Sequence, residues 1–267
     1  MLEHVWWAAH RATWFPGWFW FQAVASVTGG LLVARQEERL VLPFATGVAL
    51  AATCAIVLGC GAEWAAWIGA GGRGPLPEIE IAGFGAIGGL VFGDVLVARA
   101  RGYSARRALD VLAAPLGAMI AIARTGCFFA GCDFGKPTRV AWGLAYPTWT
   151  PAFRAQLDAG LIDASATRTL PVHPTQLYEV ALGLVILGAA LISRTPRRAG
   201  DRFTAAMLTY AAGRMFIDVF RGDLTRGGAL GLTATQALAL ATTGAVIAWR
   251  LSAAAQRPKE VSGGRPS

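Results

Sequence analysis

The sequence predicts an all-α, polytopic membrane protein of seven transmembrane helices, with an extracytoplasmic loop between the fourth and fifth helices. Of its 267 residues, 55% are hydrophobic and only 15% are charged, and its mean hydropathy is +0.48. A soluble domain carries about 25% charged residues, so this composition excludes an ordinary soluble protein. The apolar residues also fall into separate runs, each close to the ~20 residues that cross a bilayer as a helix.

Seven apolar runs are the expected spans: 14–33, 42–60, 81–98, 109–129, 174–192, 203–220 and 232–249. A cleaved signal peptide is the alternative for the first run, because Ala23-Val24-Ala25 resembles a cleavage site. The run continues past that point for a full span, which favours a helix that stays in the membrane. We expect one membrane domain over 1–251, with its polar loop at 130–172, and a disordered cytoplasmic tail over 252–267.

The distribution of basic residues predicts the orientation. The segments 34–41, 99–108, 193–202 and 250–267 hold 14 Lys and Arg, whereas the segments on the opposite side hold 8. Cytoplasmic loops carry the excess of basic residues, so the N-terminus is expected outside and the C-terminus inside. The same bias accounts for the net charge of +8. No basic run is interleaved with aromatic residues for stacking, so nucleic acid is not an expected partner.

Small and acidic residues in the spans have packing explanations. Gly85, Gly89 and Gly93 of the third span recur every four residues and leave one helix face bare. Such a ladder allows a second helix to approach closely; the alternative is that the face admits a lipid chain. Asp110, at the cytoplasmic start of the fourth span, is expected to cap that helix, where the helix dipole favours an anion.

Several charges lie within apolar runs, where an unpaired charge is costly. Arg124 is near the outer end of the fourth run, and Glu179 is a turn or more into the fifth. Arg214, Asp218 and Arg221 of the sixth run share one helix face. Asp218 can neutralise one arginine and Glu179 another, so a positive charge remains. We therefore expect a basic pocket near the outer leaflet that binds a phosphate; the alternative for Arg124 is snorkelling to the head groups.

Two of the four cysteines, Cys127 and Cys132, lie between Arg124 and Asp133. With His173 they could form a metal site, but their spacing is not a usual zinc pattern, and we expect no metal. A disulfide at an oxidising outer face is the other alternative. His173 is the only histidine outside the first ten residues, which makes it a candidate base; it could equally orient the start of the fifth span.

Three motifs resemble the prolipoprotein diacylglyceryl transferase family, and the resemblance covers most of the chain from about residue 81 to 250. The first is RTGCF at 124–128, preceded by Leu109-Asp110 and followed by GKPT at 135–138. The second is HPTQLYE at 173–179. The third is RMFIDVFR at 214–221, with Gly231-Leu232-Thr233 and Gln236 beyond it.

The resemblance implies a transferase of the bacterial inner membrane that moves the diacylglyceryl group of phosphatidylglycerol onto the lipobox cysteine of a prolipoprotein. Its implied partners are phosphatidylglycerol and the prolipoprotein signal peptide, and it needs no cofactor. The expected catalytic residues are Arg124, His173, Arg214 and Asp218. The expected phosphatidylglycerol-binding residues are Arg124, Gly126, Cys127, Gly135, Gln176, Glu179, Arg214 and Arg221.

The chain also departs from the family pattern. Cys127 replaces the asparagine of the signature, and Cys132 replaces an acidic residue, although Asp133 is adjacent. The family's His-Gly-Gly is Ile87-Gly88-Gly89 here, and the nearest aromatic to the family's first-span tyrosine is Phe21. The alternatives are therefore a related enzyme with a changed acceptor, or a non-catalytic membrane protein that binds anionic lipid.

Overall fold

The computed structural model describes residues 16–53, 83–193 and 198–222, with individual helical residues between 236 and 248. Throughout these ranges the regular elements are helices, which confirms the all-α prediction. Residues 41–53 are also helical. The named elements are α2 (Pro16–Gln36), the short 3-10 helix η1 (Glu38–Leu40), α4 (Gly83–Ala100), α5 (Ala105–Ala130), α6 (Pro151–Asp158), α7 (Thr175–Ile192) and α8 (Asp201–Asp218). Most of the expected seventh span, the end of the second and the tail lie outside the described residues.

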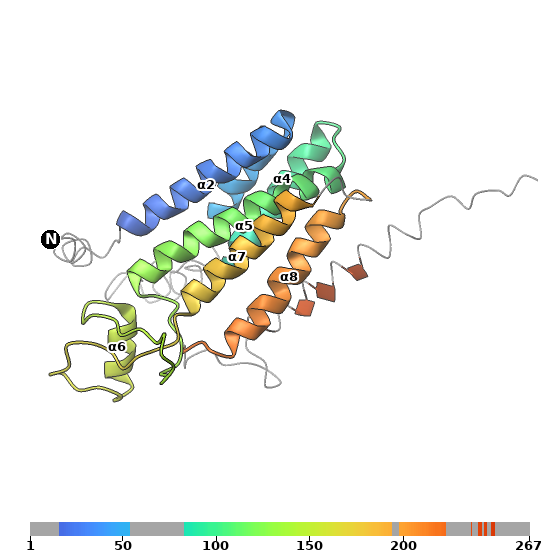
Figure 1. Ribbon diagram of the computed structural model, residues 1–267. Helices are drawn as coiled ribbons and strands as arrows, with labels where there is room; N and C mark the ends of the chain where they lie inside the picture. Colours follow the sequence, from blue (N-terminus) through green and yellow to red (C-terminus); the bar gives the residue numbers. More distant parts are fainter. Residues whose placement is uncertain are drawn as a thin grey trace, which may run out of the picture.

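Helix α5 is the centre of the bundle, with α2, α7 and α8 running alongside it (Figure 1). It packs against α2, α4, α7 and α8, and 15 of its 26 residues are buried. Residues 111–123 of α5 include no charged side chain, so this part of the helix can be covered on most of its sides. It continues through Pro115 without ending.

The contact between α5 and α7 is close because glycines face each other across it. A Cβ on Gly117 would lie 2.5 Å from the backbone nitrogen of Leu187, and one on Gly183 would lie 2.7 Å from the backbone nitrogen of Ala121. Close approach of this kind is typical of small residues at helix contacts in membranes. The two helix backbones are therefore in direct contact, and the residues farther along the same faces are brought together.

The glycine ladder of α4 packs against the helical residues 41–53. A Cβ on Gly89 would lie 2.8 Å from the Cα of Ala51, and one on Gly93 would lie 2.8 Å from the Cα of Gly47. These two positions confirm the packing explanation. The surroundings of Gly85 lie outside the described residues.

Asp110 does not cap its own helix, so that expectation was wrong. It lies six residues into α5, is buried, and its carboxylate accepts hydrogen bonds from the backbone N–H groups of Gly200 (2.6 Å) and Phe203 (3.0 Å). Those groups belong to the first turn of α8, whose N–H groups have no partner within the helix. Asp110 thus caps a different helix, because the packing of α8 brings its N-terminus against the side of α5.

By length and composition, two of the described helices, α5 and α7, could cross a membrane. The remaining expected spans, and the side of the membrane on which each end lies, stay predictions. Residues 131–174 do form the expected long connection. It contains the short helix α6, which the sequence analysis did not predict and which lies at one end of the bundle (Figure 1).

Candidate functional site

The chain reverses direction sharply where α5 ends. Gly131 adopts the left-handed conformation (φ 68°), and Asp133 does the same (φ 56°), which is uncommon for a residue other than glycine. A Cβ on Gly131 would lie 2.7 Å from side-chain atoms of Thr150, so a glycine is required there for space as well as for its backbone conformation. As a result, the residues after 131 run back beside the last turn of α5.

The returning segment is held between the start of α7 and the end of α8. The N–H of Gly135 donates to the carbonyl of His173 (3.0 Å), and the N–H of Lys136 donates to the carbonyl of Phe220 (2.8 Å). A Cβ on Gly135 would lie 2.5 Å from that His173 oxygen, so the two backbones could not approach with a larger residue. The backbone of the GKPT segment thus joins the start of α7 to the end of α8, and the Lys136 ammonium adds a hydrogen bond to the carbonyl of Val219 (3.0 Å).

The buried carboxylate of Glu179 is paired with arginines from three different segments. Its Oε2 lies 2.7 Å from Nε of Arg124. Its Oε1 accepts hydrogen bonds from Arg214 and, at 3.4 Å, from Nη1 of Arg221. The Glu179 side chain is 0% exposed. Glu179 and Arg124 follow, along the facing surfaces of α7 and α5, directly from the Gly117–Gly183 contact, so backbone packing positions this ion pair.

Asp133 completes the site as a second carboxylate. Its Oδ2 lies 2.7 Å from Nη1 of Arg124, and its Oδ1 pairs with Arg221. Burial alone would raise the pKa of Asp133, but the guanidinium groups of Arg124 and Arg221 outweigh it and hold this pKa well below its usual range. We call Arg124, Asp133, Glu179, Arg214 and Arg221 the ion cluster. With three arginines and two carboxylates it carries a net charge of +1.

The arginines of the ion cluster differ in accessibility. The Arg124 side chain is 19% exposed, whereas those of Arg214 and Arg221 are each 3% exposed. The Nε of Arg214 is buried and has no hydrogen-bond partner in the part of the chain that the structure describes. The open side of the cluster is therefore the side of Arg124 and Asp133.

One detail of the expected charged stripe was wrong. Helix α8 ends at Asp218, so Arg221 lies beyond the helix, in a segment whose backbone pairs with Gly135. Glu179 pairs with both Arg214 and Arg221, and Asp133 pairs with Arg221 as well. Asp218 itself is buried at the end of the helix, and its carbonyl accepts a hydrogen bond from the Arg221 N–H (3.2 Å). The expected pairing of Glu179 with an arginine is confirmed.

Two polar side chains at the start of α7 hold the loop that carries Asp133. The hydroxyl of Thr175 donates to the carbonyl of Asp133 (2.7 Å), and Nε2 of Gln176 donates to the carbonyl of Cys132 (2.5 Å). Both side chains belong to fully buried residues. The HPTQLYE motif therefore supplies a member of the ion cluster, Glu179, and also the hydrogen bonds that position another.

The ring of His173 is surrounded by aromatic residues. Its Nδ1 lies 3.1 Å from the hydroxyl of Tyr178, which also accepts a hydrogen bond from the indole of Trp142 (2.8 Å). The ring centroid lies 5.0 Å from that of Phe220. His173 is half-buried, and its backbone is the part that contacts the GKPT segment.

The remaining predicted residues lie on the last turns of α5. Gly126 packs against Phe21 of α2, whose Cβ would be 2.8 Å from a Cβ added at that glycine, and the Phe21 ring stacks on Phe129 at 5.9 Å. Cys127 is buried, Cys132 is half-buried, and both are free thiols. Their sulfurs and an Asp133 oxygen lie within 4.8 Å of one another.

Asp133 is the member of the ion cluster that the sequence analysis did not include among its site residues. The available signal was its position directly after Cys132, where the family pattern has an acidic residue. The left-handed backbone at Asp133 explains how a carboxylate displaced by one position still reaches Arg124 and Arg221.

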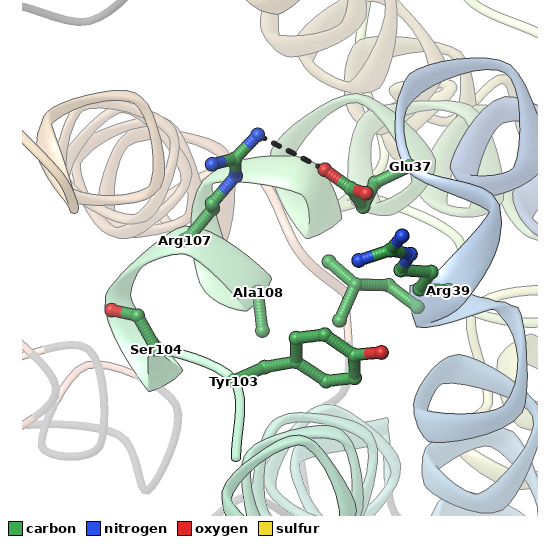
Figure 2. Close-up of a pocket in the computed structure, with 7 residues that line it drawn as sticks. Glu37, Arg39, Tyr103, Ser104, Arg107 and Ala108 are labelled. Atoms are coloured by element: carbon green, nitrogen blue, oxygen red, sulfur yellow. Dashed lines mark hydrogen bonds and ion pairs between the residues drawn. The ribbon is translucent and has the colours of Figure 1, made fainter. Parts of the chain in front are cut away.

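A cavity of about 210 Å³ lies at the opposite end of α5, near its first residues. Arg39, Tyr103 and Arg107 are among the residues that line it, and Arg107 pairs with Glu37 at 3.0 Å (Figure 2). The Arg107 side chain is 73% exposed, so this pair is in contact with solvent. The ion cluster, in contrast, is largely buried and carries a net charge, and we place the candidate functional site there.

Comparison with known proteins points to one family. Residues 76–251 match the model of a family described as prolipoprotein diacylglyceryl transferase. Three curated relatives are each named phosphatidylglycerol–prolipoprotein diacylglyceryl transferase. The relative from Rhodospirillum rubrum is 30% identical over 68% of this chain and 62% of its own length. The relative from Clostridium tetani is 28% identical over 60% of this chain and 58% of its own length. The relative from Nitrosomonas europaea is 36% identical over 40% of this chain and 32% of its own length. The chain thus spans less than two thirds of each of these relatives.

Proposed function

This chain belongs to the prolipoprotein diacylglyceryl transferase family, and we propose that it moves the diacylglyceryl group of phosphatidylglycerol onto the lipobox cysteine thiol of a prolipoprotein. The observation that carries the proposal is the ion cluster. Four of its five side chains come from the three motifs, Asp133 lies between RTGCF and GKPT, and the five together carry a net charge of +1 in a largely buried setting. An anionic ligand would balance that charge, and phosphatidylglycerol has one phosphate.

Arg124 is the arginine that meets the phosphate in this proposal. Its Nε and Nη1 are paired with Glu179 and Asp133, and its side chain is the most exposed of the three arginines, at 19%. Arg214 is held in place by Glu179, and its buried Nε is a second donor. Planar guanidinium groups suit phosphate oxygens, and they would stabilise the charge on the departing glycerol phosphate.

The acceptor thiol must lose its proton, because the thiolate is the nucleophile. Asp133 is a weak base for this step, since the arginines hold its pKa low. We propose His173 as the proton acceptor and Asp218 as a further catalytic residue. A His173→Gln variant should lose the limb of the pH–rate profile that reports the imidazole. A variant that loses stability while keeping that limb would instead indicate that His173 orients the start of α7 through Tyr178.

The proposed setting is the bacterial inner membrane, crossed seven times by one domain over residues 1–251 and followed by a cytoplasmic tail. The basic bias of the alternate loops supports a cytoplasmic C-terminus and an N-terminus outside. The signal peptide of the prolipoprotein is then the partner at the outer face. A reporter fused after Ser267 should be active in the cytoplasm; activity only outside would contradict this orientation.

The replaced motif residues favour a second candidate, a related protein with a changed acceptor or one that binds anionic lipid without catalysis. Ile87, Cys127 and Cys132 stand where the family has a histidine, an asparagine and an acidic residue. Expression in a bacterial strain depleted of its own transferase distinguishes the candidates. Growth supports the transferase; absence of growth with normal protein levels supports the second candidate.

Lipid binding tests the ion cluster separately from catalysis. Arg124→Lys and Arg214→Lys should each weaken binding of phosphatidylglycerol, measured by native mass spectrometry, and leave diacylglycerol binding unchanged. Losing one charge-assisted hydrogen bond costs about 1.5–3 kcal/mol, or roughly 10- to 150-fold in affinity. Arg107→Lys, at the exposed pair by the cavity, is the matched control. If both cluster variants keep the wild-type preference for phosphatidylglycerol, the phosphate site is not at the ion cluster.

A further inference from the structure

Two thiols meet beside the open side of the ion cluster. Cys127 lies in the last turn of α5, and Cys132 is the second residue after that helix ends. Gly131, in its left-handed conformation, turns the chain so that Cys132 comes back over the same turn. The Cys132 thiol lies 3.8 Å from the carbonyl of Cys127, and the two sulfurs lie within 4.8 Å of each other.

Asp133 is poorly placed to join these thiols as a third metal ligand. Both of its carboxylate oxygens are paired, one with Arg124 and the other with Arg221. A cation bound to the thiols would also lie beside arginines that already exceed the carboxylates in number. A bond between the two sulfurs needs neither a third ligand nor a positive charge.

We propose that Cys127 and Cys132 are a redox-active dithiol that is reversibly oxidised to a disulfide by an oxidant carrying a disulfide of its own. The Cys132 thiolate attacks the oxidant disulfide, forms a mixed disulfide and releases one oxidant thiol. The Cys127 thiolate then attacks Cys132 and releases the second. Two electrons pass from the cysteine sulfurs to the oxidant, and the two thiol protons leave with the released groups or to water.

Cys132 is assigned the first attack because it is half-buried, whereas Cys127 is 6% exposed. The hydrogen bond that Cys132 shares with Cys127, together with burial, raises the pKa of the Cys132 thiol well above its usual range. The thiolate is the attacking form, so oxidation should become faster as pH rises.

The disulfide would act on the ion cluster through its neighbours in the chain. Cys127 is three residues, about one helical turn, after Arg124, and Cys132 directly precedes Asp133. A bond between the sulfurs would therefore join the two segments that supply the 2.7 Å Arg124–Asp133 pair. We infer that the oxidised protein holds Asp133 against Arg124 more firmly than the reduced protein does. This role does not depend on the proposed transferase activity.

The chain offers a direct assay. Trypsin cleaves after Arg124 and Arg139, and a proline follows Lys136, so both cysteines fall in the peptide 125–139 while Cys54 and Cys60 do not. Purified full-length protein is equilibrated with reduced and oxidised glutathione, alkylated and digested. With oxidised glutathione the peptide should carry no alkyl group and weigh two hydrogen atoms less. With reduced glutathione it should carry two alkyl groups. If the peptide remains fully alkylated in oxidised glutathione alone, the proposal is wrong.

Single variants test the order of the steps. Cys127→Ser should accumulate a glutathione adduct on Cys132, because the resolving thiol is absent. Cys132→Ser should leave the buried Cys127 unmodified; the opposite pattern would overturn the assigned order. The oxidised wild-type protein should also melt at a higher temperature than the reduced protein, with no such difference in the double serine variant. Equal melting temperatures in a protein whose disulfide has formed would refute the proposed effect on Asp133.

Discussion

Replacing Glu179 by glutamine is the sharpest test of the ion cluster as a unit. The substitution keeps the size of the side chain but removes a charge that is 0% exposed and paired with three arginines. The net charge of the cluster would change from +1 to +2. Arg214, only 3% exposed, would lose its charged partner. Removing one partner of a buried ion pair costs about 3–5 kcal/mol, because the other charge stays buried and uncompensated.

Thermal unfolding of the purified protein in detergent measures this cost. With about 2–4 °C per kcal/mol for a chain of this size, Glu179→Gln should lower the melting temperature by roughly 6–20 °C. The matched control is Glu37→Gln, which removes the same charge from the Arg107 pair. Because Arg107 is 73% exposed, that change should cost no more than about 1 kcal/mol.

Equal effects from the two glutamine variants would refute the reasoning. If Glu179→Gln also costs under about 1 kcal/mol, the arginines are stabilised by something other than this carboxylate. The ion cluster would then not be the tightly coupled unit that its distances indicate, and a role for Arg214 as a group held in place by Glu179 would fall with it.

Three further predictions concern the scaffold and its pH dependence. Gly89→Leu should lower the yield of folded protein, because its Cβ would lie 2.8 Å from the Cα of Ala51. Gly88→Leu should not lower the yield, since no atom lies within 4 Å of a Cβ at that position. Size-exclusion chromatography of the two variants measures the difference. Asp110→Ala should reduce stability by about 0.5–2 kcal/mol through loss of the α8 cap, and an unchanged melting temperature would count against that cap. Asp133 has a depressed pKa in the folded protein, so its contribution to stability is complete above its unfolded value of about 4 and is lost as pH falls toward the folded value. Melting curves between about pH 7 and pH 3 should therefore show a loss at the acid end that is smaller in Asp133→Asn.

The helices and most of the charged site could be predicted because both are visible along the chain. Apolar runs of sufficient length predicted the long helices that the structure describes, to within a few residues, but not η1 or α6. Arg124, Glu179 and Arg214 stood out because a charge in an apolar run needs a partner. Asp133 did not stand out, because an acidic residue in a polar loop needs no special explanation.

The caps and the loop were harder to predict for a different reason. Asp110 looked like a cap for its own helix, since nothing local indicated that the start of α8 would lie against it, 90 residues away. Arg221 looked like part of a helical stripe, because nothing in the local sequence indicated that α8 ends at Asp218 and that the backbone of Arg221 pairs with Gly135. In both cases the decisive partner is distant in the sequence.

The sequence by itself determined that this chain forms apolar helices, which charges they contain, and that positive charge exceeds negative charge among them. Only the tertiary structure decided which charges pair. That choice depends on the close contact of Gly117 with Gly183, which places Arg124 beside Glu179, and on the left-handed backbone of Asp133, which turns its carboxylate toward the arginines. The hydropathy of a segment is set by residues that are adjacent in the chain, so it can be read from the sequence. An ion pair depends instead on the distance between side chains, and packing sets that distance.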